Sequence, residues 1–89
     1  MKNKVIIITG ASGGIGESLA KKFSAEGSVV VIAARQLEKL NQLKTALENS
    51  GGKVHAVACD VSNEAHCKLL IDETIRMYGR IDVLINNAG

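Results

Sequence analysis

VIIITGASGGIG, residues 5–16, joins an apolar, β-branched run to a glycine-rich turn, and a stretch with helical spacing follows it. Gly10 can take the backbone angles that end a strand sharply, Gly14 lets the main chain approach a phosphate, and Gly16 lets the new helix lie close to the sheet. The N–H groups and the dipole of that helix would face the anion. The turn therefore predicts a dinucleotide pyrophosphate site. No Gly-Lys-Ser/Thr follows, which disfavours an ATP-type P-loop.

Four short apolar runs and three helical patterns alternate along the 89 residues as one domain, residues 1–89. Near-continuous β-branched runs are typical of strands covered on both faces of a parallel sheet. With right-handed crossovers, the βαβαβαβ order predicts an α/β, Rossmann-like, three-layer fold with strand order 3-2-1-4. The expected strands are residues 5–8, 29–34, 54–58 and 81–85; the expected helices are residues 14–26, 36–50 and 63–78.

The helical patterns also predict which side chains face the core. Ile15, Leu19 and Phe23 share one stripe of the first helix, and Leu69, Leu70 and Ile75 are the apolar residues of the third. Ser62 is the expected N-cap of the third helix, because its hydroxyl can accept a backbone N–H of the first turn.

Three motifs, in order and separated by helix-length segments, resemble the short-chain dehydrogenase/reductase family. They are the Thr-Gly-x-x-x-Gly-x-Gly turn that begins at Thr9, the pair Asp60-Val61, and Asn86-Asn87-Ala88-Gly89 at the far end. The resemblance covers essentially the whole chain, but only about the first third of a usual family member. It implies an oxidoreductase that uses a nicotinamide dinucleotide.

The resemblance implies a role for each motif in binding the cofactor. Gly10, Gly14, Ile15 and Gly16 would form the pyrophosphate turn, with Ser12 aimed at the adenosine ribose and its phosphate, or else serving as loop filler. Asp60 would accept from the adenine amino group and Val61 would contact the ring through its backbone; Asp60 could also anchor the third helix. Asn87, Ala88 and Gly89 would lie beside the nicotinamide ribose, where Asn87 could equally tie two strands together.

The end of the second expected strand indicates which cofactor is preferred. An NAD site usually places a carboxylate there to bind the ribose 2′-hydroxyl, whereas this chain has Ala34 followed by Arg35. A guanidinium can hold a 2′-phosphate with charge-assisted hydrogen bonds and stack on the adenine. NADP(H) is therefore favoured over NAD(H), unless Arg35 is a solvated residue at a helix start. Many NADP-type relatives carry another cation where this chain has Gly13.

Catalysis is not expected from residues 1–89 alone. The family's catalytic Asn, Ser and Tyr-x-x-x-Lys lie beyond the matched part, and Tyr78 has no lysine four residues on. We therefore expect a binding module that holds the adenosine and pyrophosphate part of the cofactor. The alternatives are an active NADP-dependent alcohol or carbonyl oxidoreductase when a carboxy-terminal portion completes it, or a self-associating fragment that binds nothing.

Composition argues against other partners. A net charge of +2 and two aromatic residues do not suit nucleic-acid binding, and no apolar run is long enough to span a membrane, so a cytosolic location is expected. Cys59, Cys67, His55 and His66 lack a metal-site spacing and are expected to be packed or solvated residues.

The fourth expected strand raises the question of self-association. Ile81–Ile85 is apolar, and only Asp82 interrupts it. An unpaired strand edge of this kind offers N–H and C=O groups to a second copy. We therefore expect a homodimer in which two fourth strands pair about a twofold axis; exchange of a whole element between copies, or aggregation, would cover the same edge.

Overall fold

Seven elements alternate along the chain, and the computed structural model describes residues 2–87. Their bounds stay close to the expected ones, because apolar runs and glycines mark the ends of strands and helices. The elements are β1 (Val5–Thr9), α1 (Gly14–Ala25), β2 (Val29–Ala34), α2 (Leu37–Asn49), β3 (Lys53–Ala58), α3 (Glu64–Tyr78) and β4 (Val83–Asn86).

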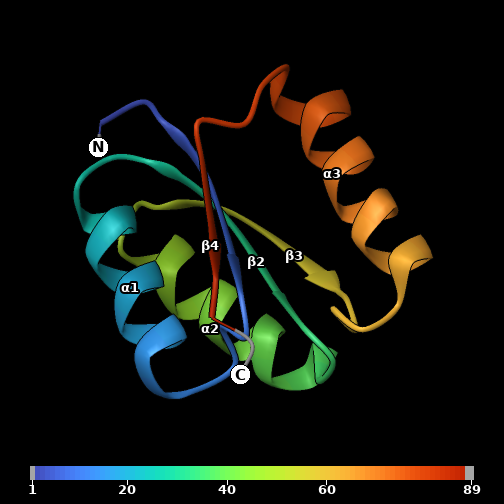
Figure 1. Ribbon diagram of the computed structural model, residues 1–89. Helices are drawn as coiled ribbons and strands as arrows, with labels where there is room; N and C mark the ends of the chain where they lie inside the picture. Colours follow the sequence, from blue (N-terminus) through green and yellow to red (C-terminus); the bar gives the residue numbers. More distant parts are fainter. Residues whose placement is uncertain (1, 88–89) are drawn as a thin grey trace.

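The sheet is parallel, with the predicted order β3-β2-β1-β4. Right-handed crossovers bring α1 and α2 back on one face of the sheet, while α3 returns on the other face and carries the chain past β1 to β4 (Figure 1). The three-layer α/β arrangement is thus confirmed. It places the carboxyl ends of the strands along one edge, where open α/β sheets bind their ligands.

The central strand β1 separates two apolar cores. Ile6 and Ile8 point to the face that α1 and α2 cover, and Ile7 points to the face that α3 covers. All five residues of β1 are buried. This burial explains the uninterrupted apolar run, since a strand covered on both faces has no solvent side on which polar residues would alternate.

Two expectations about helix faces hold only in part: Leu19, Phe23 and Leu70 pack in the two cores, but other members of the expected stripes do not. Ile15 is 69% exposed, and the buried residues of α1 are Gly16 and Ala20, because the helix approaches the sheet closely along its small side chains. On α3, Leu69 and Ile75 are exposed, and Leu70 and Thr74 are buried. The Thr74 hydroxyl donates to the Leu70 carbonyl oxygen, which satisfies it inside the core.

The N-cap of α3 is also one residue later than expected. Asn63, and not Ser62, accepts the backbone N–H of His66 through its side chain. The hydroxyl of Ser62 donates instead to Oδ1 of Asp60, at 2.7 Å. The Ser62 hydroxyl therefore binds the Asp60 carboxylate and does not cap the helix.

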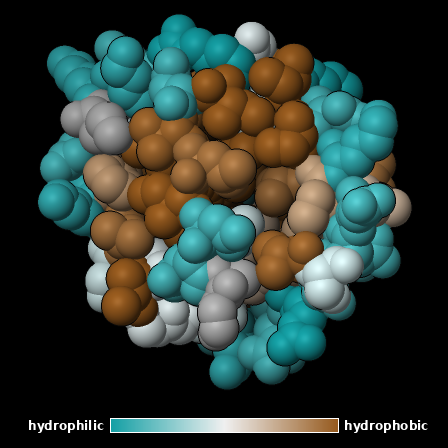
Figure 2. Space-filling view, viewed as in Figure 1, coloured by the Kyte–Doolittle hydropathy of each residue, from teal (hydrophilic) through white to brown (hydrophobic). Residues whose placement is uncertain are grey.

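The start of β4 differs from the prediction as well. Ile81 and Asp82 precede the strand: Ile81 packs against the α3-side core, and the Asp82 carboxylate accepts the Val5 N–H at 2.8 Å. Asp82 is thus hydrogen-bonded to the first residue of β1 and is not part of β4. Leu84, which is 54% exposed, lies in the strand itself, and Figure 2 shows hydrophobic side chains gathered over β4 between α1 and α3.

Among residues 2–87, no helix combines the length and the apolar character needed to cross a membrane.

Candidate functional site: a cleft at the carboxyl ends of the strands

A cleft of about 890 Å³ lies at the carboxyl ends of the strands. It gathers segments that are far apart in the sequence: the glycine turn, the end of β2, the loop after β3 and the residue after β4. Eight of the sequence-predicted residues line it, and Gly13, Ala34, Gln36 and Cys59 complete the wall; the eight are Gly10, Ser12, Gly14, Ile15, Arg35, Asp60, Val61 and Asn87.

The glycine turn has the geometry that its sequence predicts. Gly10 and Gly14 have φ angles of 64° and 58°, which side chains rarely allow. Gly16 does not line the cleft but packs behind it, where an added Cβ would meet the Gly10 carbonyl oxygen and Nδ2 of Asn87. Within the described residues, no side chain caps the start of α1. Its first N–H groups therefore remain available to an anion.

Thr9 supports the glycine turn through hydrogen bonds to the residues that end β4 and follow it. Its hydroxyl donates to Oδ1 of Asn86 at 2.8 Å and accepts the N–H of Asn87 at 3.1 Å. Since Thr9 ends β1 and Asn86 ends β4, the hydroxyl joins the two strand ends that flank the turn. Asn87, which the sequence left between a structural and a binding role, lines the cleft and also contacts the region of Gly16.

The Asp60-Val61 pair forms a second wall of the cleft. Oδ1 of Asp60 accepts from the hydroxyl and the N–H of Ser62, and these bonds, helped by the positive charge of Arg35, hold the pKa of Asp60 below its usual range. The carboxylate is therefore ionised at neutral pH. Val61 is 38% exposed, as a residue that faces a cleft would be.

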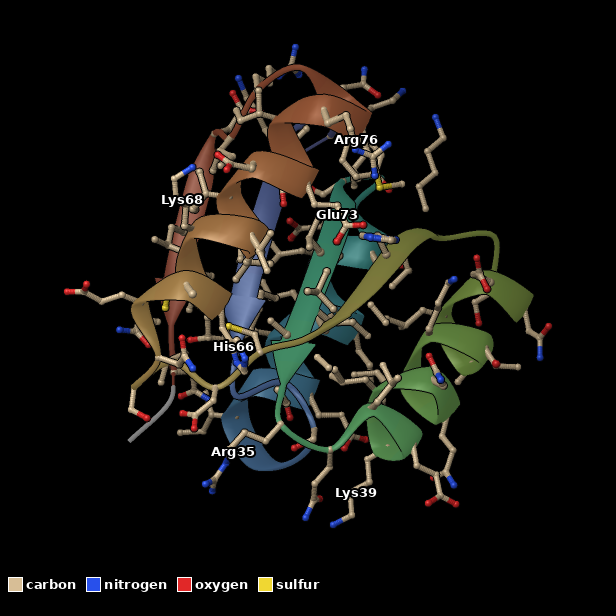
Figure 3. The ribbon with its side chains drawn as sticks, turned by 90° about the vertical axis from the view of Figure 1, so that its right-hand side faces the viewer. Arg35, Lys39, His66, Lys68, Glu73 and Arg76 are labelled. Atoms are coloured by element: carbon tan, nitrogen blue, oxygen red, sulfur yellow. The ribbon has the colours of Figure 1, made fainter. Side chains whose placement is uncertain are left out.

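The end of β2 forms the third wall. Ala34 is buried at the strand end, and Arg35 follows it with its side chain exposed to solvent (Figure 3). Gln36, the N-cap residue of α2, also lines the cleft, and within residues 2–87 no side chain caps that helix. The sequence analysis missed Gln36, although its position directly after Arg35 at a helix start was a usable signal.

Three further expectations can be placed. Ala88 and Gly89 lie outside the described residues. Cys59 is a buried thiol, as expected, and burial raises its pKa, but it also contributes to the cleft wall. Tyr78 packs against the α3-side core, and burial, followed by the charge of Glu48, raises the pKa of its phenol. Tyr78 is thus poorly suited to acid–base chemistry at neutral pH.

The two histidines lie outside the cleft. Nε2 of His55 is 3.5 Å from a carboxylate oxygen of Glu73, and His66 accepts a backbone N–H of the Asp60 loop. In the part of the chain that the structure describes, no three His, Cys, Asp or Glu side chains gather as metal ligands would.

Comparison with known proteins agrees with this geometry. The family model for short chain dehydrogenase matches residues 4–89, and the chain belongs to the short-chain dehydrogenase/reductase family. It is 48% identical over 88 residues to 7alpha-hydroxysteroid dehydrogenase from Bacteroides fragilis, covering 99% of this chain and 34% of that enzyme.

Two solved structures share its fold closely. A metagenomic short-chain oxidoreductase in complex with NADP has a TM-score of 0.94 and 37% identity, covering 100% of this chain and 40% of that one. L-Sorbose reductase from Gluconobacter frateurii, complexed with NADPH and L-sorbose, has a TM-score of 0.96 and 36% identity, covering 100% of this chain and 34% of that one. The chain therefore spans well under half the length of these relatives.

Proposed function

We propose that this chain binds NADP(H) in the cleft at the carboxyl ends of its strands. The observation that carries the proposal is the convergence of three walls: the uncapped start of α1, the Asp60-Val61 pair, and Arg35 after β2. The helix start suits the pyrophosphate, the Asp60 carboxylate suits the adenine amino group, and the guanidinium suits a 2′-phosphate. Ser12 would bind the adenosine ribose and its phosphate.

The preference for NADP(H) over NAD(H) rests on Ala34 and Arg35. A methyl group stands at the strand end where a carboxylate would bind the 2′-hydroxyl of NAD, and a carboxylate there would repel a 2′-phosphate. A charge-assisted hydrogen bond contributes about 1.5–3 kcal/mol, which corresponds to roughly one to two powers of ten in affinity. Relatives that were solved with NADP and NADPH support the proposal.

Calorimetric titration of NADPH and NADH at one salt concentration tests this preference. Arg35→Ala should lose most of the NADPH advantage and leave NADH binding nearly unchanged. Lys39→Ala is the matched control, because Lys39 is an exposed cation in the first turn of α2 and not part of the cleft wall (Figure 3). Equal affinity of the wild-type chain for the two cofactors would refute the proposal.

The family chemistry is hydride transfer between the nicotinamide and an alcohol or carbonyl group. We assign that activity to a protein in which a carboxy-terminal portion supplies the catalytic Ser, Tyr and Lys. Residues 1–89 bind without turnover, because Tyr78 is packed in a core and has no lysine beside it. Oxidation of NADPH by this chain with generic ketones, abolished by a substitution inside it, would contradict this assignment.

We propose as well that two copies of the chain associate through β4. Among the described strands β4 pairs with β1 alone, and Leu84 exposes an apolar side chain beside the unpaired edge. Two such edges can pair about a twofold axis and continue the sheet. A cytosolic location also stays a prediction, for which fractionation is the measurement.

A further inference from the structure

The first turn of α3 anchors the backbone of the Asp60-Val61 pair. His66 lies in that turn, and its Nδ1 accepts the backbone N–H of Asp60 at 3.1 Å. The next residue, Cys67, directs its thiol to the carbonyl oxygen of Val61 at 3.4 Å. The pair is therefore tied to the helix and is not held by its own loop alone.

His66 is fixed by its own backbone as well. Its N–H donates to Oδ1 of Asn63, the N-cap residue, at 3.2 Å. Ser62, which directly precedes Asn63, donates its N–H to Asp60 Oδ1 at 3.0 Å. These bonds close one network of loop and helix, and Figure 3 shows His66 at the same end of the molecule as Arg35. A change at the imidazole would therefore alter the position of the Asp60 carboxylate.

We propose that His66 is a positioning residue for the adenine end of the cofactor. Its unprotonated Nδ1 holds the Asp60 N–H, and with it the carboxylate of Asp60 and the backbone of Val61, in the orientation that meets the base. His66 acts through this pair and need not touch the nucleotide. The inference rests on the proposed function, because it assigns the pair to adenine.

The chemistry of imidazole makes the role specific. The donor is a backbone N–H, so Nδ1 must be the acceptor and the proton of the neutral ring must be on Nε2. Imidazole is the side chain that ordinarily gains its charge between about pH 5 and 8. Once Nδ1 carries a proton, it faces another donor and the hydrogen bond is lost.

Charged neighbours determine what the protonated ring would do. On one side of the ring lie the Asp60 carboxylate and, beyond it, Arg35. On the other side His66 lines a smaller groove between β3 and α3, whose charged members are Asp72, Glu73 and Arg76, and His55 pairs with this Glu73. Among these, the Asp60 carboxylate belongs to the residue that the ring already contacts. An imidazolium would draw that carboxylate toward itself and away from the base.

Calorimetric titration of adenosine 2′,5′-bisphosphate at about pH 7.5 tests the inference. This probe carries the adenine and the 2′-phosphate but no nicotinamide. His66→Ala should bind it about threefold to tenfold more weakly, which is the usual worth of one hydrogen bond. His66→Asn should bind within about twofold of wild type, because Oδ1 of asparagine can accept where Nδ1 does. Lys68→Ala, elsewhere on α3, should match the wild type.

A second titration at about pH 5.5 separates positioning from general support of the fold. The probe's phosphates also titrate in this range, but they do so equally for every variant. Because a protonated Nδ1 can no longer accept the Asp60 N–H, the affinity of the wild type should fall several-fold relative to that of His66→Asn. In the free wild-type chain, ¹⁵N NMR should show the Nε2–H tautomer.

The outcomes are distinct. If the wild-type chain fails to bind the probe at about pH 7.5, the proposed function fails and this inference fails with it. If the wild type binds but His66→Ala binds as tightly, or His66→Asn follows the wild-type pH profile, this inference alone is overturned. Should His66→Ala fail to fold, the comparison of wild type with His66→Asn and the NMR measurement still decide.

Discussion

The hydroxyl of Thr9 lies 2.8 Å from Oδ1 of Asn86, although the two residues are separated by nearly the whole chain. Thr9 ends β1 and Asn86 ends β4, so this bond joins the two strands at the floor of the cleft. The Thr9 hydroxyl oxygen also accepts the N–H of Asn87. The position of Asn87, which lines the cleft, therefore depends on the buried hydroxyl of Thr9 in β1.

Thr9→Val should lower the free energy of unfolding by about 1–2 kcal/mol, because it leaves the Asn87 N–H and Asn86 Oδ1 without their shared partner. Urea unfolding measures this loss. Thr9→Ser keeps the hydroxyl and loses one methyl group, so it should be destabilised but should bind NADPH like the wild type. Weak binding by Thr9→Ser would show that the hydroxyl does not position Asn87.

Gly16→Ala should destabilise the chain by about 1–3 kcal/mol, the usual cost of overpacking. Its Cβ would meet the Gly10 carbonyl oxygen and Asn87 Nδ2, and it would push α1 away from the turn. Gly13→Ala is the matched control, since an added Cβ at Gly13 meets nothing within 4 Å. Thermal unfolding compares the two, and equal stability would contradict the close approach at Gly16.

Asp82 should make the fold sensitive to acid. The Val5 N–H, followed by Arg80, holds the pKa of this carboxyl below its usual range, so the folded state favours the charged form. The stabilisation is complete above the ordinary carboxyl pKa of about 4 and is lost as pH falls through the lowered pKa of the folded state. Asp82→Asn should be less stable at neutral pH and should lose less stability on acidification. Urea unfolding of both proteins across this pH range measures the difference. A parallel loss of stability in the two proteins would contradict the assignment.

Leu84→Lys should dissociate the proposed dimer, because it places a charge beside the β4 edge. Light scattering at high micromolar concentration should give twice the chain mass for the wild type and the monomer mass for the variant. Leu37→Lys is the control: Leu37 is 45% exposed, but it lies on α2, which packs against β2 and β3. A monomeric wild type would end the proposal.

The amino-acid sequence by itself determined the order of elements, the parallel sheet and the edge at which the cleft forms. These follow from local signals, such as β-branched runs and the glycine turn, and from the fixed handedness of crossovers. The motifs marked most of the cleft wall for the same reason, since carboxyl ends of parallel strands meet at one edge.

Only the tertiary structure decided how side chains from different elements meet. The rotation of α1 about its axis turned Ile15 out and Gly16 in, because small residues let a helix approach a sheet. Likewise, His66 meets the Asp60 N–H because the loop folds back on the helix. Such contacts depend on how closely the elements approach one another, and the spacing of residues along the chain does not encode that approach.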